Sequence, residues 1–266
     1  MKKKGWDTAS FGPDGTALQR ADDAGKQLSS NRNPLGEKMS RYEIENASGP
    51  RIAVVGVGGA GCNVVSTFYD NLAPVDTIAI NTDKDALHSA RADQKLYICK
   101  QVLHGEGAQG DATIGRRCAD IHKEEIFEAL SDYDAVFVIA GLGGGTGTGA
   151  MSVVLDAAHS QGVMTFAIAI NPFSFEGGRT SVAAEAWNHI KSIYENCIRI
   201  DNDKILGLMP DLDMAQAFDK VNRSLMHYIL KCTDILCNVL DDAPAGEDGS
   251  EAQHAEHCTI SALMSA

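Results

Sequence analysis

Six short apolar segments that alternate with stretches of helical spacing constrain the fold of this chain more than any other feature. The segments are residues 51–56, 77–80, 95–98, 135–140, 163–170 and 197–200. They are rich in β-branched residues and too short for helices, so we predict six buried strands. Strands that alternate with helices form an open, mostly parallel sheet with helices on both faces. The sequence therefore predicts an α/β, doubly wound, Rossmann-like fold, which binds ligands beyond the carboxyl ends of its strands.

The last periodic segment predicts one long C-terminal helix. Apolar residues recur at spacings of three and four between Met214 and Leu240, which indicates a helix from about residue 213 to 240, roughly 40 Å long. Such a helix is longer than one layer of an α/β domain needs. We expect its apolar stripe to be exposed and available to a partner or to aggregation.

These elements divide the chain into three parts. Residues 49–240 hold all the strands and the long helix, and we predict one domain there. Residues 1–48 are polar without sustained periodicity, so we predict a disordered N-terminal extension. Residues 241–266 contain six acidic residues and no Lys or Arg, which predicts an acidic disordered tail.

Charge and cysteine usage narrow the possible partners. The formal net charge of −13 disfavours non-specific binding to nucleic acid or to an anionic membrane. No run of 18 uninterrupted apolar residues occurs, so we predict no membrane insertion. The seven cysteines form no CxxC pair, and reduced thiols in a cytoplasmic protein are the simplest interpretation. The His and Cys residues near position 258 fit no usual zinc spacing, so we predict no metal site there.

A first glycine loop follows the first predicted strand. It reads GVGGAGCN over residues 56–63, a GxGxxG turn that opens a helix. The glycines allow a tight turn, and they let a pyrophosphate approach the amides at the positive end of the helix. Taken alone, this turn also fits a nicotinamide- or flavin-dependent enzyme, with Asp83 as the ribose contact. An NAD-binding oxidoreductase is therefore one alternative.

A second glycine loop, GLGGGTGTGA over residues 141–150, follows the strand at 135–140 and separates the alternatives. It has six glycines in ten residues and no lysine, so it is not an ordinary P-loop with GK[ST]. Two such loops facing one crevice suit a di- or triphosphate. Backbone amides, two helix dipoles and a magnesium ion would neutralise its charge, with Thr146 and Thr148 as added donors. The simpler alternative is that the glycines only permit close packing of helix on strand.

Several motifs together resemble those of the tubulin/FtsZ family, and of prokaryotic FtsZ in particular. The motifs are GVGGAGCN at 56–63, NTD at 81–83, GEGAQGDATIG at 105–115, GGGTGTG at 143–149, NPFSFEG at 171–177 and NDK at 202–204. They occur in the family's order over about residues 51–240. The resemblance implies a GTP-binding cytoskeletal domain of the cell-division type, with strand order 3-2-1-4-5-6. It also implies GTP or GDP as ligand, with Mg²⁺.

The same resemblance assigns site residues along the phosphates and the ribose. Those implied to hold the phosphates are Gly59, Ala60, Gly61, Cys62, Asn63, Gly143, Gly144, Gly145, Thr146 and Gly147, with Ala108 and Gly110 near the terminal phosphate. Asn81 and Asp83 would lie beside the phosphates or a magnesium-bound water, and a plain Asx turn is the alternative. Glu176 would contact the ribose, unless it belongs to a solvated turn.

The base end of the expected site departs from the family pattern. The resemblance implies that Asn202 reads the base and that Phe218 stacks on it, although a Phe on an apolar helical stripe is ordinarily core. The family has Asn-Asp where this chain has Asn222-Arg223. Because Arg accepts no hydrogen bond, guanine selectivity would rest on Asn202 and Asn222.

Two further departures concern charge and catalysis. The family has an Arg where this chain has Thr180, and Arg179 stands one position earlier, so either a shift restores the contact or one charge is missing. FtsZ hydrolyses GTP between subunits through an acidic loop after the long helix, and the sequence after Leu240 does not match that loop or the second domain. We expect a nucleotide switch with little GTPase activity of its own, able to bind an FtsZ-like subunit head-to-tail at a filament end. A degenerate scaffold without nucleotide is the remaining alternative.

Overall fold

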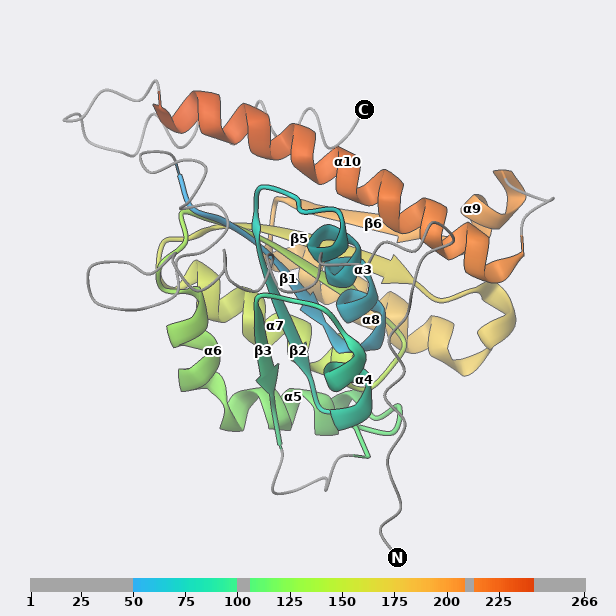
Figure 1. Ribbon diagram of the computed structural model, residues 1–266. Coiled ribbons are helices and arrows are strands. Elements are labelled where there is room, and N and C mark those ends of the chain that lie inside the picture. The colour runs from blue at the N-terminus through green and yellow to red at the C-terminus, as the bar shows by residue number, and fades with distance from the viewer. Residues whose placement is uncertain (1–49, 100–105, 209–212, 242–266) are drawn as a thin grey trace, which may run out of the picture. The chain divides into compact units, whose positions relative to one another are not determined.

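Six parallel strands form the sheet at the centre of the structure (Figure 1). The computed structural model describes residues 50–99, 106–208 and 213–241, so the predictions for residues 1–48 and 242–266 lie outside it. The strand order is β3-β2-β1-β4-β5-β6, which confirms the predicted fold class and order. The strands are β1 Ile52–Val57, β2 Asp76–Asn81, β3 Gln94–Tyr97, β4 Ala135–Gly141, β5 Met164–Asn171 and β6 Cys197–Asp201.

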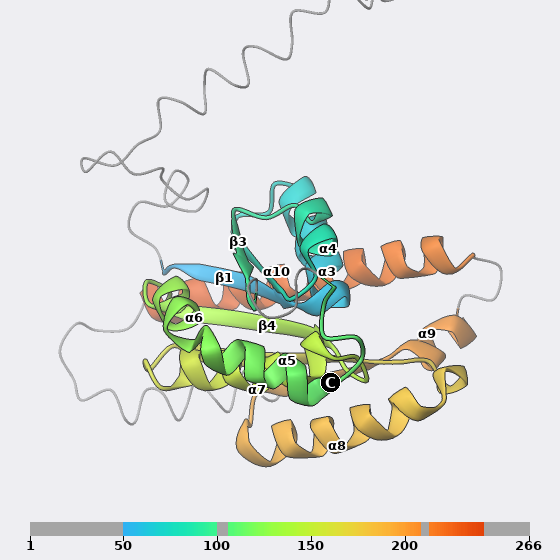
Figure 2. The ribbon, with the colours of Figure 1, turned by 90° about the horizontal axis from the view of Figure 1, so that it is seen from below.

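Helices cover both faces of the sheet. Their bounds are α3 Gly58–Asp70, α4 Lys84–Ser89, α5 Ala112–Ile121, α6 Lys123–Leu130, α7 Thr146–His159, η1 Ser174–Glu176, α8 Gly178–Ile193, α9 Asn202–Leu208 and α10 Met214–Asp241. Helices α3 and α10 pack on one face, and α5, α6, α7 and α8 pack on the other (Figure 2). No helix in the described ranges is long and apolar enough to cross a membrane.

The central strands are buried along their length, which explains their uninterrupted apolar sequence. Every residue of β1 is buried, and so are the first six residues of β4. Strands covered by helices on both faces have no solvated side, so their sequence shows no alternation of polar and apolar residues. In the register, Val57 of β1 lies between Ile80 of β2 and Ala140 of β4. The turns that follow these three strands therefore meet at one edge of the sheet.

Helix α10 confirms the predicted long helix, and it corrects the expectation about the helix's apolar stripe. The helix has 28 residues. Its stripe is buried at Ala217, Val221, Leu225, Met226, Ile229, Cys232 and Leu236. Leu225 and Ile229 pack with Phe68 of α3 and with apolar side chains of the sheet. The expectation of an exposed stripe was wrong because α10 lies along the sheet, and each fully buried Leu or Ile contributes about 1.5–3 kcal/mol.

A disulfide joins Cys99, two residues beyond β3, to Cys118 in α5. Both residues are buried, and Cys99 has a φ of 63°, which is uncommon for a residue other than glycine. The expectation of reduced thiols throughout was therefore wrong for this pair. The bond fixes α5 to the chain just beyond β3.

Candidate functional site

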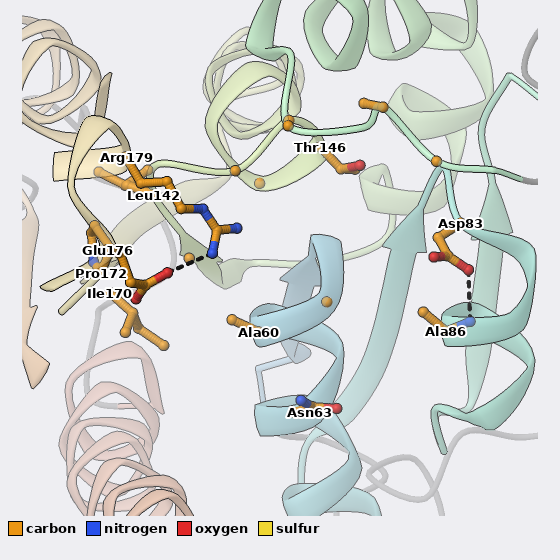
Figure 3. A pocket seen from close by; sticks show the side chains of 18 of the residues that line it. Ala60, Asn63, Asp83, Ala86, Leu142, Thr146, Ile170, Pro172, Glu176 and Arg179 are labelled. Carbon is orange, nitrogen blue, oxygen red and sulfur yellow. Dashed lines mark hydrogen bonds and ion pairs between the residues drawn. The ribbon is translucent and has the colours of Figure 1, made fainter. Parts of the chain in front are cut away.

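A cavity of about 590 Å³ lies at the carboxyl edge of the sheet. Residues from the ends of β2, β4 and β5, from the start of α3 and α7, and from the first turns of α10 line it. The close-up in Figure 3 shows Ala60 of α3 between Arg179 on one side and Asp83 on the other. One end of the cavity is built from glycine turns and the other from aromatic and amide side chains, so the two ends suit different chemical groups.

The first glycine turn leads directly from β1 into α3. Gly58 has a φ of 73°, and a Cβ on it would lie 2.8 Å from the amide nitrogen of Gly147, so the two glycine loops touch. No side chain caps the N-terminus of α3, and Gly59, Ala60 and Asn63 of this helix line the cavity. The unpaired amides and positive dipole end of α3 are therefore available to an anion.

The second glycine turn repeats this arrangement from β4 into α7. Helix α7 also begins without a side-chain cap, and Gly144, Gly145, Thr146 and Gly147 line the cavity. The Thr146 hydroxyl lies 2.5 Å from the Thr82 hydroxyl, which ties this turn to the end of β2. Two uncapped helix N-termini thus converge on one cavity, an arrangement that favours a ligand with several negative charges.

Arg179 is the positively charged side chain among the described residues that line the cavity. Its Nε donates to the carbonyl oxygen of Gly143 at 3.2 Å, and its Nη1 lies 2.5 Å from Oε2 of Glu176. Figure 3 shows the guanidinium group directed toward the start of α3. Thr180 lies outside the lining, and its hydroxyl donates to the carbonyl of Gly177. The one-position shift therefore still brings a positive charge to the cavity.

The carboxylates of the lining are largely engaged. Oδ1 of Asp83 accepts a hydrogen bond from the Ala86 amide at 2.9 Å and so caps α4, while the Asp83 amide donates to Asn81. This is the Asx-type turn that was the alternative for Asp83, yet Asp83 and Asn81 also line the cavity. Both oxygens of Glu176 are used, by the Phe173 amide and by Arg179. Asp83 and Glu106 each keep one carboxylate oxygen with no hydrogen bond to a described residue, since Asp83 uses only Oδ1 and Glu106 only Oε2.

The other end of the cavity is aromatic and amide-rich. The rings of Phe173 and Phe218 meet edge to face with centroids 5.6 Å apart. Phe218 is 40% exposed, so the alternative of an ordinary core residue does not describe it. Asn202 is buried, with 7% of its surface exposed, and its side chain makes no hydrogen bond with any described residue. Arg223 lies outside the lining and pairs with Asp219 at 2.8 Å.

The structure brings together most of the residues predicted from the sequence. Those that line the cavity are Gly59, Ala60, Asn63, Asn81, Asp83, Ala108, Gly110, Gly144, Gly145, Thr146, Gly147, Glu176, Asn202, Phe218 and Asn222. Those that lie outside the lining are Gly61, Cys62, Gly143, Thr180 and Arg223. Lining residues that the sequence did not single out include Glu106, Gln109, Leu142, Ile170, Pro172 and Phe173, whereas Arg179, the alternative to Thr180, does line the cavity. Glu106 and Gln109 belong to the glycine-rich motif at 105–115, which was the available signal for them.

Cys62 supports the first glycine turn from behind. The residue is 1% exposed, and its thiol donates toward the carbonyl oxygens of Gly56 and Ile80. Burial raises the pKa of this thiol to about 12, partly offset by a hydrogen bond from Asn81. The side chain therefore stays neutral and packs, while the loop around it faces the cavity.

Comparisons with known proteins agree with this geometry. Residues 51–210 match the family described as "Tubulin/FtsZ family, GTPase domain". Cell division protein FtsZ 2 of Halobacterium salinarum is 40% identical over 175 residues, covering 65% of this chain and 44% of that protein. The chain thus spans about half the length of the curated relatives it matches.

Solved structures show the same similarity. An empty FtsZ dimer of M. jannaschii superposes with a TM-score of 0.69 at 31% identity, covering 81% of this chain and 62% of that one. CetZ2 of Haloferax volcanii, solved as a GTPγS-bound protofilament, superposes with a TM-score of 0.62 at 25% identity, covering 68% and 57%.

Proposed function

Because the chain belongs to the tubulin/FtsZ family, we propose that its cavity binds GTP or GDP as a nucleotide switch. The observation that carries the proposal is the convergence of two uncapped helix N-termini, α3 and α7, on one cavity that also contains Arg179. Each helix terminus is equivalent to about half a positive charge. Together with Arg179 they attract the phosphates, and the aromatic end around Phe218 receives the base.

A magnesium ion would complete the neutralisation of a triphosphate. Mg²⁺ keeps several waters and needs only one or two protein carboxylates beside the phosphate oxygens. Asp83 fits this role because its second oxygen is not engaged by a described residue. When bound, the ion would supply charge neutralisation at the β- and γ-phosphates. Asp83 would orient a coordinated water while its first oxygen keeps the start of α4 in place.

We further propose that the chain turns GTP over slowly. Of the carboxylates in the lining, both oxygens of Glu176 are held, and Asp83 is the residue proposed for the magnesium-bound water. Glu106 has one oxygen held by Gln109 at 2.9 Å and lies on an exposed side chain, whereas water positioning depends on fixed geometry. The purified chain should therefore bind GTP while releasing phosphate slowly. GTPase activity that rises steeply with the concentration of the chain would contradict this.

A head-to-tail partner is the third element of the proposal. The names of the similar structures describe a dimer and a protofilament. In this chain Phe175 is 70% exposed beside the cavity, where it stacks on Phe173. A second FtsZ-like subunit that docks over the cavity would cover this ring. We expect the chain to co-sediment with a full-length FtsZ in the presence of GTP, and the variant Phe175→Asp to lose this co-sedimentation. Pelleting that does not depend on the nucleotide would contradict the proposal.

Nucleotide titration with a matched pair of variants tests the binding proposal. GTP and GDP with Mg²⁺ should raise the melting temperature and give saturable calorimetric titrations. Arg179→Ala should weaken binding by roughly 10- to 150-fold, because hydrogen bonds to charged groups contribute about 1.5–3 kcal/mol. Thr180→Ala, one residue away and outside the lining, should bind like the wild type. Stabilisation by NADH alone would favour the oxidoreductase, and stabilisation by no nucleotide would favour the scaffold.

A further inference from the structure

We propose that this cavity accepts adenine and guanine nucleotides with similar affinity, and that the amide of Asn222 is the feature that sets this weak selectivity. The inference rests on the proposed nucleotide-binding function and adds the class of ligand. A base would lie at the aromatic and amide end of the cavity, opposite the two glycine turns that would bind the phosphates. The described residues at that end offer stacking surfaces and amides, with no free carboxylate.

The apolar surfaces at this end discriminate little between purines. Phe173, Phe218 and Val221 line it, and Phe173 is 5% exposed while Phe218 is 40% exposed. Phe218 thus has ring surface open to the cavity that a flat base can cover. Stacking on an aromatic ring depends little on which base is bound, because every base has a π-face. These residues therefore favour a purine without choosing which one.

Hydrogen bonding at this end comes from amide side chains. Asn171, Asn202 and Asn222 line the cavity. Oδ1 of Asn171 is buried without a hydrogen bond to a described residue, and neither Asn202 nor Asn222 has a side-chain hydrogen bond to a described residue. Asn202 is more than nine-tenths buried, so an unpaired amide there costs free energy until a ligand satisfies it. An Asn amide has both a donor and an acceptor, and rotating the group exchanges their positions.

The nearby carboxylates are engaged elsewhere. Asp203 accepts hydrogen bonds from the amide and the hydroxyl of Ser174. Asp219 pairs with Arg223 on the exposed side of α10, outside the lining. Glu176, which does line the cavity, is held at both oxygens. Among the described side chains at this end, a base would therefore meet amides at its edge and no free carboxylate.

This chemistry predicts weak discrimination. Guanine presents two neighbouring donors, N1–H and the 2-amino group, whereas adenine presents a 6-amino donor beside the N1 acceptor. A carboxylate only accepts, so it would bind guanine's pair of donors strongly and repel the lone pair of adenine N1. An amide pairs its donor and acceptor with guanine's O6 and N1–H or, after rotating, with adenine's N1 and 6-amino group. We expect the dissociation constants of GDP and ADP to differ by less than about tenfold.

Calorimetric titration of the full chain with GDP, ADP, IDP and CDP, each with Mg²⁺, tests the inference. IDP lacks the 2-amino group and should bind like GDP, and CDP should bind more weakly because a pyrimidine covers less of the Phe218 ring. Asn222→Asp should raise the GDP-to-ADP preference at least tenfold. Arg223→Ala, which alters a neighbouring side chain outside the lining, should leave the ratio unchanged.

The outcomes separate this inference from the proposed function. Dissociation constants of GDP and ADP that differ by more than about tenfold in the wild-type chain would overturn the inference while supporting nucleotide binding. Binding of no nucleotide would overturn both. If Asn222→Asp fails to fold, as judged by circular dichroism, Asn222→Ala replaces it. That variant should weaken GDP and ADP equally, and a selective loss of GDP binding would overturn the inference.

Discussion

Replacing Gly149 by Ala should destabilise the protein, although the same change stabilises most helices. Gly149 lies inside α7, where Gly→Ala normally gains about 1 kcal/mol. Here the added Cβ would lie 2.0 Å from the carbonyl oxygen of Ala112 and 2.4 Å from the amide nitrogen of Arg116, both in the backbone of α5. Backbone atoms of a packed helix are unable to turn aside as a flexible side chain would. The two helices must therefore separate.

The size of the effect follows from these two opposing contributions. Overpacking of this kind costs typically 1–3 kcal/mol, occasionally more, and the short contact places Gly149→Ala at the upper end of that range. After the gain in helix propensity is subtracted, we expect a net loss of about 1–2 kcal/mol of unfolding free energy. For a domain of this size that corresponds to a decrease in melting temperature of roughly 2–8 °C.

Thermal and urea unfolding followed by far-ultraviolet circular dichroism measures this loss. The matched control is Gly178→Ala at the start of α8, where a Cβ would meet no atom within 4 Å. That variant should be unchanged or more stable by about 0.4–1 kcal/mol, because Ala restricts the unfolded chain. If Gly149→Ala proved as stable as Gly178→Ala, the close contact of α5 with α7 would be refuted.

Two further predictions concern the cysteines. Reduction of the Cys99–Cys118 bond, which spans a sequence separation of 19, should lower the unfolding free energy by about 3 kcal/mol in the chain-entropy model. Urea unfolding with and without dithiothreitol measures this loss of stability. The variant Cys118→Ser should show the same loss, whereas the control Cys197→Ser should not. Equal stability with and without dithiothreitol would show that no bond forms. Because burial raises the pKa of Cys62 from 9.0 to about 12, the unfolded state loses this proton first as the pH rises. The stabilisation from the neutral thiol is present below pH 9 and declines between pH 9 and 12 by up to roughly 1.4 kcal/mol per pH unit. The variant Cys62→Ala should show a shallower decline over that range, and an identical slope would contradict the assignment.

The sheet was predictable because its signal is local. A strand such as β4, buried on both faces, must be apolar at every position, so residues 135–140 identify it directly. The coverage of α10 was not predictable in the same way. Spacing showed that residues such as Leu225 and Ile229 share one face, but the groups that cover them, including Phe68, are distant in the sequence.

The glycine run illustrates a second limit of sequence interpretation. Gly144, Gly145 and Gly147 line the cavity, whereas a Cβ on Gly149 would enter the backbone of α5. Both proposed roles, ligand approach and close packing, thus occur within one motif. The spacing of the glycines in the sequence is the same for ligand approach and for close packing. Only the position of α5 in the fold shows which glycine has which role.

The remaining differences arose from single positions. The family pattern aligned Thr180 with the site and left open whether Arg179 replaces it, and the geometry of the turn into α8 brings Arg179 into the lining. The pairing of Cys99 with Cys118 had no spacing signal, since it depends on where α5 packs beside the end of β3. Contacts of this kind depend on tertiary structure, which local patterns do not encode.

The position of β1 has a consequence for how the chain folds. β1 comes first in the sheet's sequence order but lies at its centre, and Ile52 pairs with Ala135, 83 residues further along. The entropy lost in closing so long a loop must be overcome before the two strands pair, which slows folding. Until β4 emerges from the ribosome, one edge of an entirely apolar strand has no native neighbour and is open to pairing with other chains. Synthesis of the stretch between these two strands is thus the interval in which a nascent chain most needs a chaperone.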